Sequence, residues 1–459
     1  MLNNYFNESV LKEIFYKKIY YRGSMGIDGM SPTHYGKDID RNVEYIIKKI
    51  KSQDYKFIPY KEKLVLKSRN KTPRMMSIPC VRDKLVVGTL TKMIQGVFGD
   101  RVSRKLPNNF IADIKRIIKS NEGNLFFIKA DIKNFFPTIE HDKLLNLLKK
   151  RELCPYTLHL IQELLKNPTV PENCKRINRE KYVNNTGTPQ GLSISSILSD
   201  IYLTDIDSFF KSQSQEISYF RYVDDILLLV RNENDITRLK KSLESEFEKI
   251  GLSLNPDKND YGQIQKGFTF LGYKISHPTI TVKDKNVNNF IKKIAQNFNW
   301  FKKIYQKPFL LGVGDIKDKN KIKTRFINEL NDRITGVIID NRKYGWVFYF
   351  NEVDDIKLLF VLDNIVDSFF KKLDEFDNKT PKEVKRFVRA YYESKRRLSG
   401  NYIRNFNKYT TIQDKIKYLK DNVILDSTRQ YKKEEIEYLF EKTKFNRMSK
   451  LKLDVGKKS

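Results

Sequence analysis

Apolar and polar positions along the chain recur with two different periods, which predict a mixture of strands and helices. Short apolar runs bounded by turn residues predict strands at 64–67, 74–78, 125–130, 217–222 and 226–230. Apolar residues spaced by three and four predict helices over much of 83–120, 141–166, 193–210 and 235–250. This part of the chain is therefore expected to contain both strands and helices.

From about residue 283 the pattern becomes almost purely helical. Apolar residues on a single face step by four or three, and they are Val287, Ile291, Ile294, Phe298, Phe301 and Tyr305. This spacing predicts a long helix whose aromatic side chains face a core. Further helices are predicted at about 353–373, 381–396 and 411–420. The last 18 residues contain seven Lys or Arg and one Asp, and we expect them to be mobile.

The charge of the chain narrows the choice of partner. Its 459 residues include 87 Lys and Arg against 56 Asp and Glu, a formal net charge of +31. Hydrophobic residues make up 40% and aromatic residues 12%, which is enough for a sizeable core and excludes wholesale disorder. A surface this basic calls for a polyanionic partner, and we expect a nucleic acid in preference to an anionic membrane surface.

Cysteine and histidine usage bears on the compartment and on metal chemistry. Cys80, Cys154 and Cys174 are far apart and form no CxxC pair, so we expect no disulfide framework and a cytoplasmic location. The four histidines share no metal-ligand spacing with one another or with the cysteines, which excludes a zinc finger. We also expect no signal peptide and no membrane span, because the longest apolar runs are far too short.

The most informative side chains are carboxylates at the ends of buried strands. Asp131 follows the apolar strand 125–130, and Asp224 and Asp225 lie between the strands 217–222 and 226–230. A carboxylate among so many apolar residues is costly unless a cation accompanies it. The cation could be Lys or Arg in a structural ion pair. It could equally be a divalent metal, since Mg²⁺ prefers carboxylate oxygens and two metals suit nucleotidyl transfer.

A series of motifs, in order along residues 26–273, resembles those of reverse transcriptases. The motifs are Gly26-Ile27-Asp28-Gly29, Lys67 with Arg74–Pro79, Arg82-Asp83-Lys84, Asp131–Phe136, Thr188-Pro189-Gln190-Gly191, Tyr222-Val223-Asp224-Asp225, Leu254–Lys258 and Phe270-Leu271-Gly272. Each is weak when it stands alone. Their common order is specific, and it resembles the bacterial branch that includes group II intron and retron enzymes.

The resemblance implies a metal-dependent active site. Asp131 and Asp224 would hold two Mg²⁺ ions, with Mn²⁺ as an alternative, and Asp225 would support them as a third carboxylate. Lys258 would neutralise the leaving group. The reaction would be nucleotidyl transfer from dNTPs, with RNA as template and DNA as product.

The resemblance also assigns the residues around the incoming nucleotide. Lys67 and Arg74 would bind the triphosphate, and Gln190 and Gly191 would line the nucleotide pocket. Phe136 would lie beneath the sugar and exclude a 2′-hydroxyl, which argues for DNA as the product. The primer grip would be formed by Phe270, Leu271 and Gly272.

The resemblance implies an α+β fold, a right-hand polymerase with fingers, an RRM-like antiparallel palm and a helical thumb, followed by an α-helical C-terminal extension. The fingers would span 1–105 and 142–186, and the palm 106–141 and 187–278. The thumb would span 279–345, leaving 346–459 as a helical, basic C-terminal region.

The C-terminal part points to a particular branch of the family. No Cys follows 174 and no His follows 277, so the Cys/His endonuclease of many group II intron proteins is not expected. Several segments resemble defence-associated, stand-alone bacterial reverse transcriptases: Arg333–Gly336, Tyr344–Phe350, Leu362-Asp363 and Arg386–Arg389. This resemblance implies an antiphage role, with a dedicated non-coding RNA, a partner protein or a homo-oligomer.

Three functions remain open on the sequence. The first is a templated RNA-directed DNA polymerase. The second is template-independent or protein-primed DNA synthesis at the same site, for which the 25 tyrosines offer too many candidate primers to choose among. The third is a non-catalytic RNA-binding scaffold, which the intact Asp131, Asp224, Asp225 and Gln190 disfavour.

Overall fold

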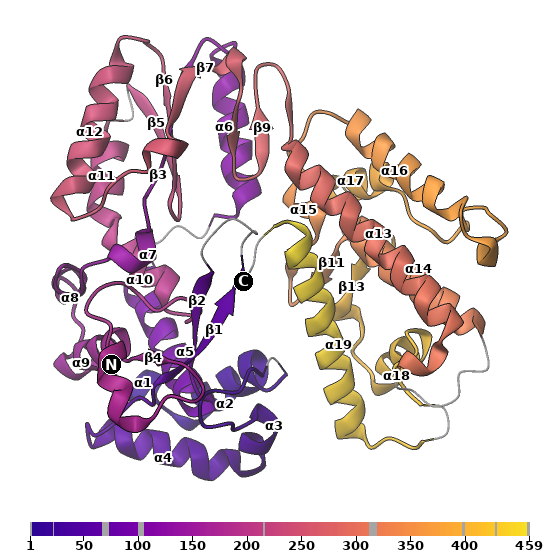
Figure 1. Ribbon diagram of the computed structural model, residues 1–459, viewed down its shortest axis with the longest axis horizontal. Helices are drawn as coiled ribbons and strands as arrows, with labels where there is room; N and C mark the ends of the chain where they lie inside the picture. The colour runs from indigo at the N-terminus through magenta and orange to yellow at the C-terminus, as the bar shows by residue number, and fades with distance from the viewer. Residues whose placement is uncertain are drawn as a thin grey trace. The chain divides into compact units, whose positions relative to one another are not determined.

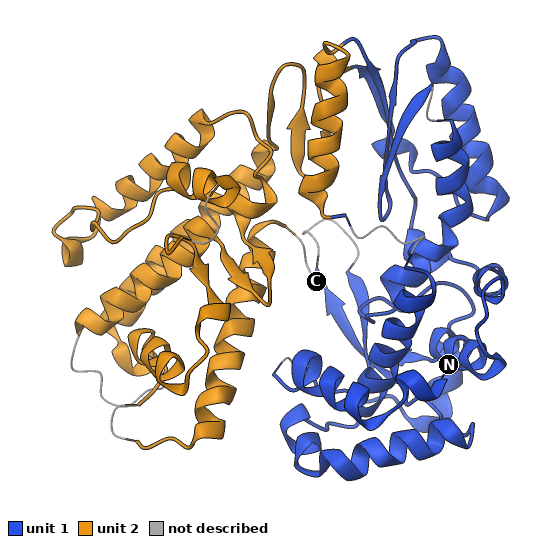
Figure 2. Cartoon of the chain, turned by 180° about the vertical axis from the view of Figure 1, so that it is seen from behind, with its two compact units in different colours: residues 1–105, 124–263 blue, residues 106–123, 264–459 orange. Residues whose placement is uncertain are grey.

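The computed structural model describes residues 2–21, 23–66, 73–99, 105–213, 216–311, 319–396, 400–426 and 429–456 (Figure 1). The chain forms two compact units (Figure 2). Unit 1 comprises residues 1–105 and 124–263, and unit 2 comprises residues 106–123 and 264–459. Both units combine helices with small sheets, so the expected α+β fold is confirmed.

The centre of unit 1 is a four-stranded antiparallel sheet in the order β5-β6-β3-β7. Its strands are β3 (Phe126–Asp131), β5 (Ile217–Tyr222), β6 (Asp225–Val230) and β7 (Asp260–Gln263). The three strands predicted in this region are confirmed. Residues 226–230 of β6 are all buried, so both faces of this strand are covered.

Helices follow the sheet strands in unit 1. They are α8 (His141–Lys149), α9 (Pro155–Lys166), α10 (Ser195–Tyr202), α11 (Thr204–Ser212) and α12 (Asp235–Lys249). The single helix expected at 193–210 is therefore two helices, α10 and α11. The break occurs at Leu203, where the Thr204 hydroxyl donates to the Ile201 carbonyl at 2.8 Å, a local bond that competes with the helical ladder.

The remainder of unit 1 is mostly helical and carries one hairpin. The helices are α1 (Leu2–Tyr5), α2 (Glu8–Ile14) continued by a π-helical turn (Phe15–Ile19), α3 (Pro32–Tyr35), α4 (Ile39–Lys51) and α5 (Val81–Val97). The hairpin pairs β1 (Tyr60–Val65) with β2 (Arg74–Ile78), and β4 (Thr169–Val170) adds to β1 in parallel. The predicted strand 74–78 is confirmed, whereas the strand predicted at 64–67 begins earlier, at Tyr60, and ends at Val65. Residues 67–72, which include most of the predicted turn, lie outside the described residues.

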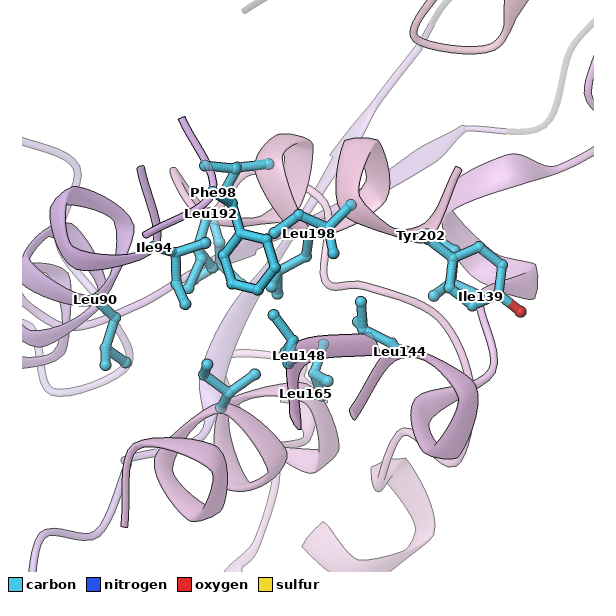
Figure 3. Close-up of a cluster of buried hydrophobic side chains, with 14 of the residues drawn as sticks. Leu90, Ile94, Phe98, Ile139, Leu144, Leu148, Leu165, Leu192, Leu198 and Tyr202 are labelled. Carbon is cyan, nitrogen blue, oxygen red and sulfur yellow. The ribbon is translucent and has the colours of Figure 1, made fainter. Parts of the chain in front are cut away.

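An apolar core supports the segment that leads into α10. Leu90 and Ile94 of α5, Leu144 and Leu148 of α8, and Leu192 point into a common cluster (Figure 3). Each of these side chains is buried. Leu192, the residue that follows the Thr188–Gly191 motif, is therefore packed in the core and anchors the end of the motif.

Unit 2 contains two small sheets. One is the antiparallel meander β8 (Phe268–Phe270), β9 (Tyr273–Ile275) and β10 (Ile280–Val282). The other has the order β12-β11-β13, with β11 (Val337–Ile339), β12 (Arg342–Tyr344) and β13 (Arg404–Asn405).

The helices of unit 2 make up most of its mass. They are α6 (Pro107–Ser120), α13 (Asp284–Gln306), α14 (Lys319–Thr335), α15 (Trp346–Tyr349), α16 (Lys357–Phe370), α17 (Phe387–Arg396), α18 (Ile412–Asp421) and α19 (Lys433–Asp454). Short 3₁₀ turns connect several elements of both units. Among the described residues, no helix combines the length and apolar character needed to cross a membrane.

Two expectations about unit 2 need correction. In α13 the predicted Ile294, Phe298 and Phe301 are buried, but Phe290 and Ile304 complete the buried face in place of Val287, Ile291 and Tyr305, which are half-buried. The C-terminal end, expected to be mobile, instead forms α19 as far as Asp454. Arg447 and Asp454 of this helix are buried in ion pairs. The charges of the sequence alone do not show whether such residues are buried or lie in a solvated tail.

The two units do not follow the predicted boundaries one for one. Residues 106–123, assigned to the palm in the prediction, pack with unit 2, where Lys115 forms an ion pair with Asp354. Residues 264–278 also belong to unit 2. The division into fingers, palm and thumb stays a prediction.

Candidate active site

The two adjacent strands β3 and β6 bring the three predicted carboxylates to one end of the sheet. In the antiparallel register Asp131 lies directly opposite Asp225. Asp224 occupies the turn between β5 and β6, and its carbonyl accepts a bond from the Ile132 amide at 3.1 Å. The carboxylates therefore meet because the strands that carry them pair, although Asp131 and Asp224 lie 93 positions apart in sequence.

The β5–β6 turn has an unusual backbone. Val223 has φ of +59°, a left-handed conformation that a β-branched residue rarely adopts. The Arg221 guanidinium donates to the Val223 carbonyl at 3.1 Å and so holds the turn from beneath. Arg221 is itself fixed by two bonds of 2.7 Å to Asp207 and by one of 3.0 Å to Asp200.

This Arg221 cluster is buried and charged. The Arg221 side chain is only 6% exposed, and the Tyr219 hydroxyl adds a 2.8 Å bond to Asp207. A buried arginine is tolerated here because both neighbouring carboxylates pair with it. The sequence motif did not identify this role, although a charged residue within the apolar strand 217–222 was a usable signal.

Lys258 lies beside Asp131. The Asn255 amide donates to the Asp131 carbonyl at 2.7 Å, and Leu254 forms a bridge with Ile132, which docks residues 254–258 on the end of β3. The Lys258 ammonium then forms an ion pair with the Asp131 carboxylate. Asp131 therefore has the lysine partner expected of a structural ion pair. It also lies among other carboxylates, as expected of a metal site.

Negative charge is crowded at this end of the sheet. Burial, and next the charge of Asp224, raise the pKa of Asp225 to about 6. Asp131 raises this pKa further, while Lys129 and Lys258 lower it in part. The cluster would therefore gain from an additional cation.

The loop before α10 is clamped onto the segment after β3. The Gly187 amide donates to the Ile139 carbonyl at 2.7 Å, and the Thr188 amide donates to the Phe136 carbonyl at 2.8 Å. Gly187 has φ of +83°, and a Cβ there would lie 2.8 Å from the Pro137 backbone, so glycine is required. His141, whose Nε2 lies 2.7 Å from the Gly187 carbonyl oxygen, secures the same turn.

The other side of this loop rests on β2. The Ser77 amide donates to the Gln190 carbonyl at 2.7 Å. Gly191 follows with φ of +103°, and a Cβ on it would approach the Ser77 carbonyl oxygen to 3.1 Å. The Thr188–Gly191 motif therefore joins the hairpin to the end of the sheet.

A cleft of about 590 Å³ opens where these segments meet. Six of the predicted site residues line it: Arg74, Asp131, Phe136, Gln190, Asp224 and Lys258. Asn134, Asn184, Thr186 and Thr188 line it as well and were not predicted. Thr188 is the most suggestive of these, because its hydroxyl is buried and has no hydrogen-bond partner among the described residues.

The adjacent rings of Phe135 and Phe136 divide between two environments. Phe135 is 3% exposed and belongs to the apolar core, whereas Phe136 is half-buried and lines the cleft. Arg74, at the start of β2, is exposed at the cleft. An apolar ring and a guanidinium thus line a single cavity with two carboxylates.

The other predicted residues lie elsewhere. Lys67 falls outside the described residues. Phe270, Leu271 and Gly272 belong to unit 2, where the Tyr349 hydroxyl donates to the Leu271 carbonyl at 3.1 Å.

Two upstream motifs meet each other and do not line the cleft. Gly26 packs so tightly on Cys80 that a Cβ would lie 2.5 Å from the Cys80 Cα. In the adjoining helix, the buried Asp83 accepts bonds from the Tyr55 hydroxyl and, at 2.8 Å, from the Ile58 amide. These contacts give the Gly26–Gly29 and Arg82–Lys84 motifs a structural role.

The cleft fits a divalent metal by its donor chemistry. In the described part of the chain, no three His, Cys, Asp or Glu side chains are already gathered into a metal site. However, Asp131 and Asp224 present carboxylates to the same cleft, and the charge of Asp224 adds to burial in raising the pKa of Asp225. Carboxylate oxygens are the ligands that Mg²⁺ prefers.

A comparison with protein families finds a match over the segment that forms this cleft. Residues 61–275 match the family described as reverse transcriptase (RNA-dependent DNA polymerase). All of the residues that line the cleft fall within that segment.

Curated relatives match part of the chain. An uncharacterized 91 kDa protein in the cob intron of Schizosaccharomyces pombe is 31% identical over 217 residues, covering 45% of this chain and 25% of that protein. The group II intron-encoded protein LtrA of Lactococcus lactis is 25% identical over 37% of this chain and 28% of its own length. Protein YkfC of Escherichia coli is 21% identical over 54% of this chain and 75% of its own.

The chain spans about a quarter to a third of the two first relatives' length, 25% of the S. pombe protein and 36% of a putative COX1/OXI3 intron 2 protein of Saccharomyces cerevisiae. These matches therefore concern a shared domain and not the longer proteins as wholes. Among solved structures, telomerase from Candida albicans with a TWJ fragment of telomeric RNA aligns over 76% of this chain and 64% of that chain, at 15% identity and a TM-score of 0.42. A likeness of that size supports no conclusion.

Proposed function

We propose that the chain, whose residues 61–275 match the reverse transcriptase family, is an RNA-directed DNA polymerase, a nucleotidyltransferase that extends a DNA strand on an RNA template. The cleft of unit 1 is its catalytic centre. The observation that carries the proposal is the convergence of Arg74, Asp131, Phe136, Gln190 and Asp224 on one cavity.

Asp131 and Asp224 would hold the divalent metal, and Asp225 would contribute charge beside them. When bound, two Mg²⁺ ions would activate the primer 3′-hydroxyl and neutralise the departing pyrophosphate. Lys258, already paired with Asp131, balances the carboxylates and lies where it can neutralise phosphate charge. Arg74 offers a planar guanidinium to the triphosphate.

The sugar and base are selected by the remaining residues of the cleft. Phe136 presents an apolar ring that gives a 2′-hydroxyl no hydrogen-bond partner and competes with it for space, which favours dNTPs. Gln190 and the buried Thr188 hydroxyl supply polar groups on the opposite loop. The fixed Gly187 turn keeps this loop against the residues that follow Phe136.

The test is incorporation of labelled dNTP by the purified chain with Mg²⁺, with and without RNase pretreatment, beside the variant Asp224→Asn. We expect incorporation that is lost with RNase and lost by at least about a hundredfold in the variant, since the carboxylate acts on the reacting groups. Arg238→Gln, an exposed arginine of α12, is the matched control and should retain the parent rate.

The remaining outcomes separate the alternatives. Incorporation that survives RNase, together with label covalently attached to the protein, would replace templated synthesis by protein-primed synthesis. An absence of incorporation with every template would favour a non-catalytic RNA-binding scaffold.

We propose further that the enzyme acts in antiphage defence. Support comes from the C-terminal segments 333–336, 344–350, 362–363 and 386–389, which resemble those of defence-associated reverse transcriptases. Phage plating on bacteria that express the parent chain or Asp224→Asn tests this role. We expect protection with the parent alone, and equal plating on both strains would contradict it.

A further inference from the structure

Unit 2 has a cleft of its own, separate from the catalytic one. It lies between α16 and α17 and has a volume of about 680 Å³. The residues that characterise it are Phe360, Asp363, Arg386, Arg389, Tyr392 and Arg396. None of them belongs to the reverse transcriptase domain of residues 61–275.

Two carboxylates of α16 are satisfied by protein groups. Asp363, which lines the cleft, is buried and accepts bonds from the amides of Phe387 at 2.7 Å and Val388 at 3.3 Å. Nη1 of Arg386 donates to both carboxylate oxygens of Asp367, at 2.8 and 2.7 Å. The sequence segments 362–363 and 386–389 therefore meet here, and together they fix the start of α17.

The exposed face of α17 is what this arrangement presents. Arg389, Tyr392 and Arg396 occur at spacings of three and four and so lie on one side of the helix. Arg389 has a side chain 65% exposed and stacks 4.3 Å over the Tyr402 ring. Arg396 lies 5.8 Å from the centre of the Tyr392 ring.

Two aromatic rings are exposed in the same cleft. Phe360 of α16 is 56% exposed and Tyr392 of α17 is 41% exposed. The remaining acid is Glu393, which is 3.5 Å from Arg389 and 13% exposed. The accessible chemistry is thus aromatic rings flanked by guanidinium groups.

Rings beside guanidinium groups suit a single-stranded nucleic acid. Bases stack on Phe and Tyr with little regard to sequence, while arginine pairs with the intervening phosphates. A duplex would hide its bases from such rings, and a small anion would leave the rings without a function.

We propose that the α16–α17 cleft binds single-stranded RNA, with a base stacked on Phe360 and Tyr392 and flanking phosphates at Arg389 and Arg396. This inference rests on the proposed function, because it takes RNA to be the polymer that the chain handles. It adds an RNA attachment site in unit 2 that is independent of the catalytic carboxylates.

The test uses the full chain and a fluorescein-labelled oligouridine of about 12 nucleotides, with EDTA and without dNTP, followed by fluorescence anisotropy. The double variant Phe360→Ala with Tyr392→Ala should bind about tenfold more weakly or worse, as expected for the loss of base stacking. Phe360→Tyr with Tyr392→Phe keeps both rings and should bind like the parent. Arg342→Gln, an exposed arginine elsewhere in unit 2, is the control for charge.

Photocrosslinking locates the contact directly. A 4-thiouridine in the same RNA should crosslink to peptides from 357–396, and the crosslink should disappear in the double alanine variant. Affinity within twofold of the parent and no crosslink in that segment would overturn the proposal and leave an acidic protein surface as the occupant of the cleft.

A second assay separates this inference from the proposed function. Incorporation on a short pre-annealed primer–template should be the same in the double alanine variant as in the parent. If the parent incorporates nothing but the alanine variant loses RNA affinity, the polymerase proposal fails and the RNA site stands. If the parent incorporates and the variant binds RNA normally, the RNA site alone fails.

Discussion

At the scale of single residues, the cleft of unit 1 depends on a left-handed backbone conformation that is unfavourable for Val223, the residue that adopts it. Val223 and Asn134 have φ of +59° and +49°, and left-handed backbone at a β-branched residue persists only where the surroundings impose it. Around Val223 these surroundings are the bond from Arg221 and the bond from the Ile132 amide to Asp224. Asp224 is therefore presented by contacts on both sides of its turn.

Arg221 acts as a positioning residue, and its replacement should reveal that. Lysine keeps the charge but cannot donate to Asp207, Asp200 and the Val223 carbonyl together. We expect Arg221→Lys to lower kcat by about tenfold to a hundredfold, as for other groups that orient metal ligands, with KM for dNTP changed less than threefold. Steady-state kinetics measure this split.

The control is Arg238→Lys, on the exposed face of α12. A merely structural Arg221 would instead lower the melting temperature and leave the kcat of the folded fraction unchanged. An equal loss in kcat and KM would also contradict the positioning role.

Asp224→Asn should separate catalysis from stability. Its charge contributes to the raised pKa of Asp225, so the amide relieves repulsion within the cluster. We expect the melting temperature in EDTA near neutral pH to be unchanged or higher, measured by differential scanning fluorimetry. A markedly earlier transition would mean that Asp224 serves chiefly in a structural ion pair.

In the proposed function Phe136 selects the sugar of the incoming nucleotide. Replacing it by Val leaves an apolar surface but removes the ring from the cleft. We expect the preference of Phe136→Val for dNTP over rNTP, as a ratio of kcat/KM values, to fall by about tenfold or more. Phe136→Tyr keeps the ring and should keep the preference, and a ratio unaffected by Val would exclude Phe136 as the selective residue.

At the scale of elements, charged side chains join α19 to α14. Arg447 pairs with Glu329 at 3.3 Å, and Arg333 pairs with Asp454 at 2.8 Å. All four side chains are at most 9% exposed. Removing one member of such a pair leaves the other charge buried, which costs about 3–5 kcal/mol.

The Glu329 pair gives stability a defined pH dependence. Burial alone would raise the pKa of Glu329, but Arg447, Lys450 and Arg325 outweigh it and lower the pKa to about 2. A folded-state pKa below the ordinary value of 4.5 means that the stabilisation is present above pH 4.5 and is lost as the pH falls toward 2. We expect Glu329→Gln to melt well below the parent at pH 6, with the gap narrowing below about pH 4.5.

Thermal melts followed by circular dichroism at several pH values measure this gap. Glu383→Gln replaces an exposed acid of the same unit and should leave the melting temperature unchanged at every pH. A gap for Glu329→Gln that is constant with pH would contradict the ionic role.

Sequence patterns predicted the elements whose cause is local. Strands β3, β5 and β6 of the sheet and the hairpin were predicted, because apolar runs and turn residues are visible within a few neighbouring positions. The six cleft residues were predicted through the motifs that surround them. The break at Leu203 and part of the buried face of α13 were missed, because both depend on tertiary contacts.

Long-range charge pairing was the other source of error. The partners of Arg221 and of Arg447 lie on other elements, and nothing in the local pattern shows that these charges are buried. For the same reason the C-terminal helix resembled a basic tail. The roles of the Thr188 hydroxyl and of the contact between His141 and Gly187 could not be predicted, since a single polar side chain in a loop has many uses.

At the scale of the whole molecule, we expect the net charge of +31 to govern how tightly the chain binds RNA. Each phosphate contact with a single strand contributes about 0.7 to the slope of log affinity against log salt. We expect a steep negative slope for oligouridine between about 50 and 300 mM KCl, measured by anisotropy. Arg389→Gln with Arg396→Gln should reduce it by about one, and a slope near zero in the parent would contradict electrostatic RNA binding.

The path of the chain between its two units has a consequence for protein engineering and for recombination in evolution. The chain passes from one unit to the other near residues 105, 123 and 263, because 106–123 packs with the C-terminal half. A cut at residue 263 would not yield unit 1 alone, since it would leave α6 attached without the residues it packs against. An exchange of unit 2 between relatives must therefore transfer two separate segments, 106–123 and 264–459, at the same time. The two segments should accordingly be inherited together.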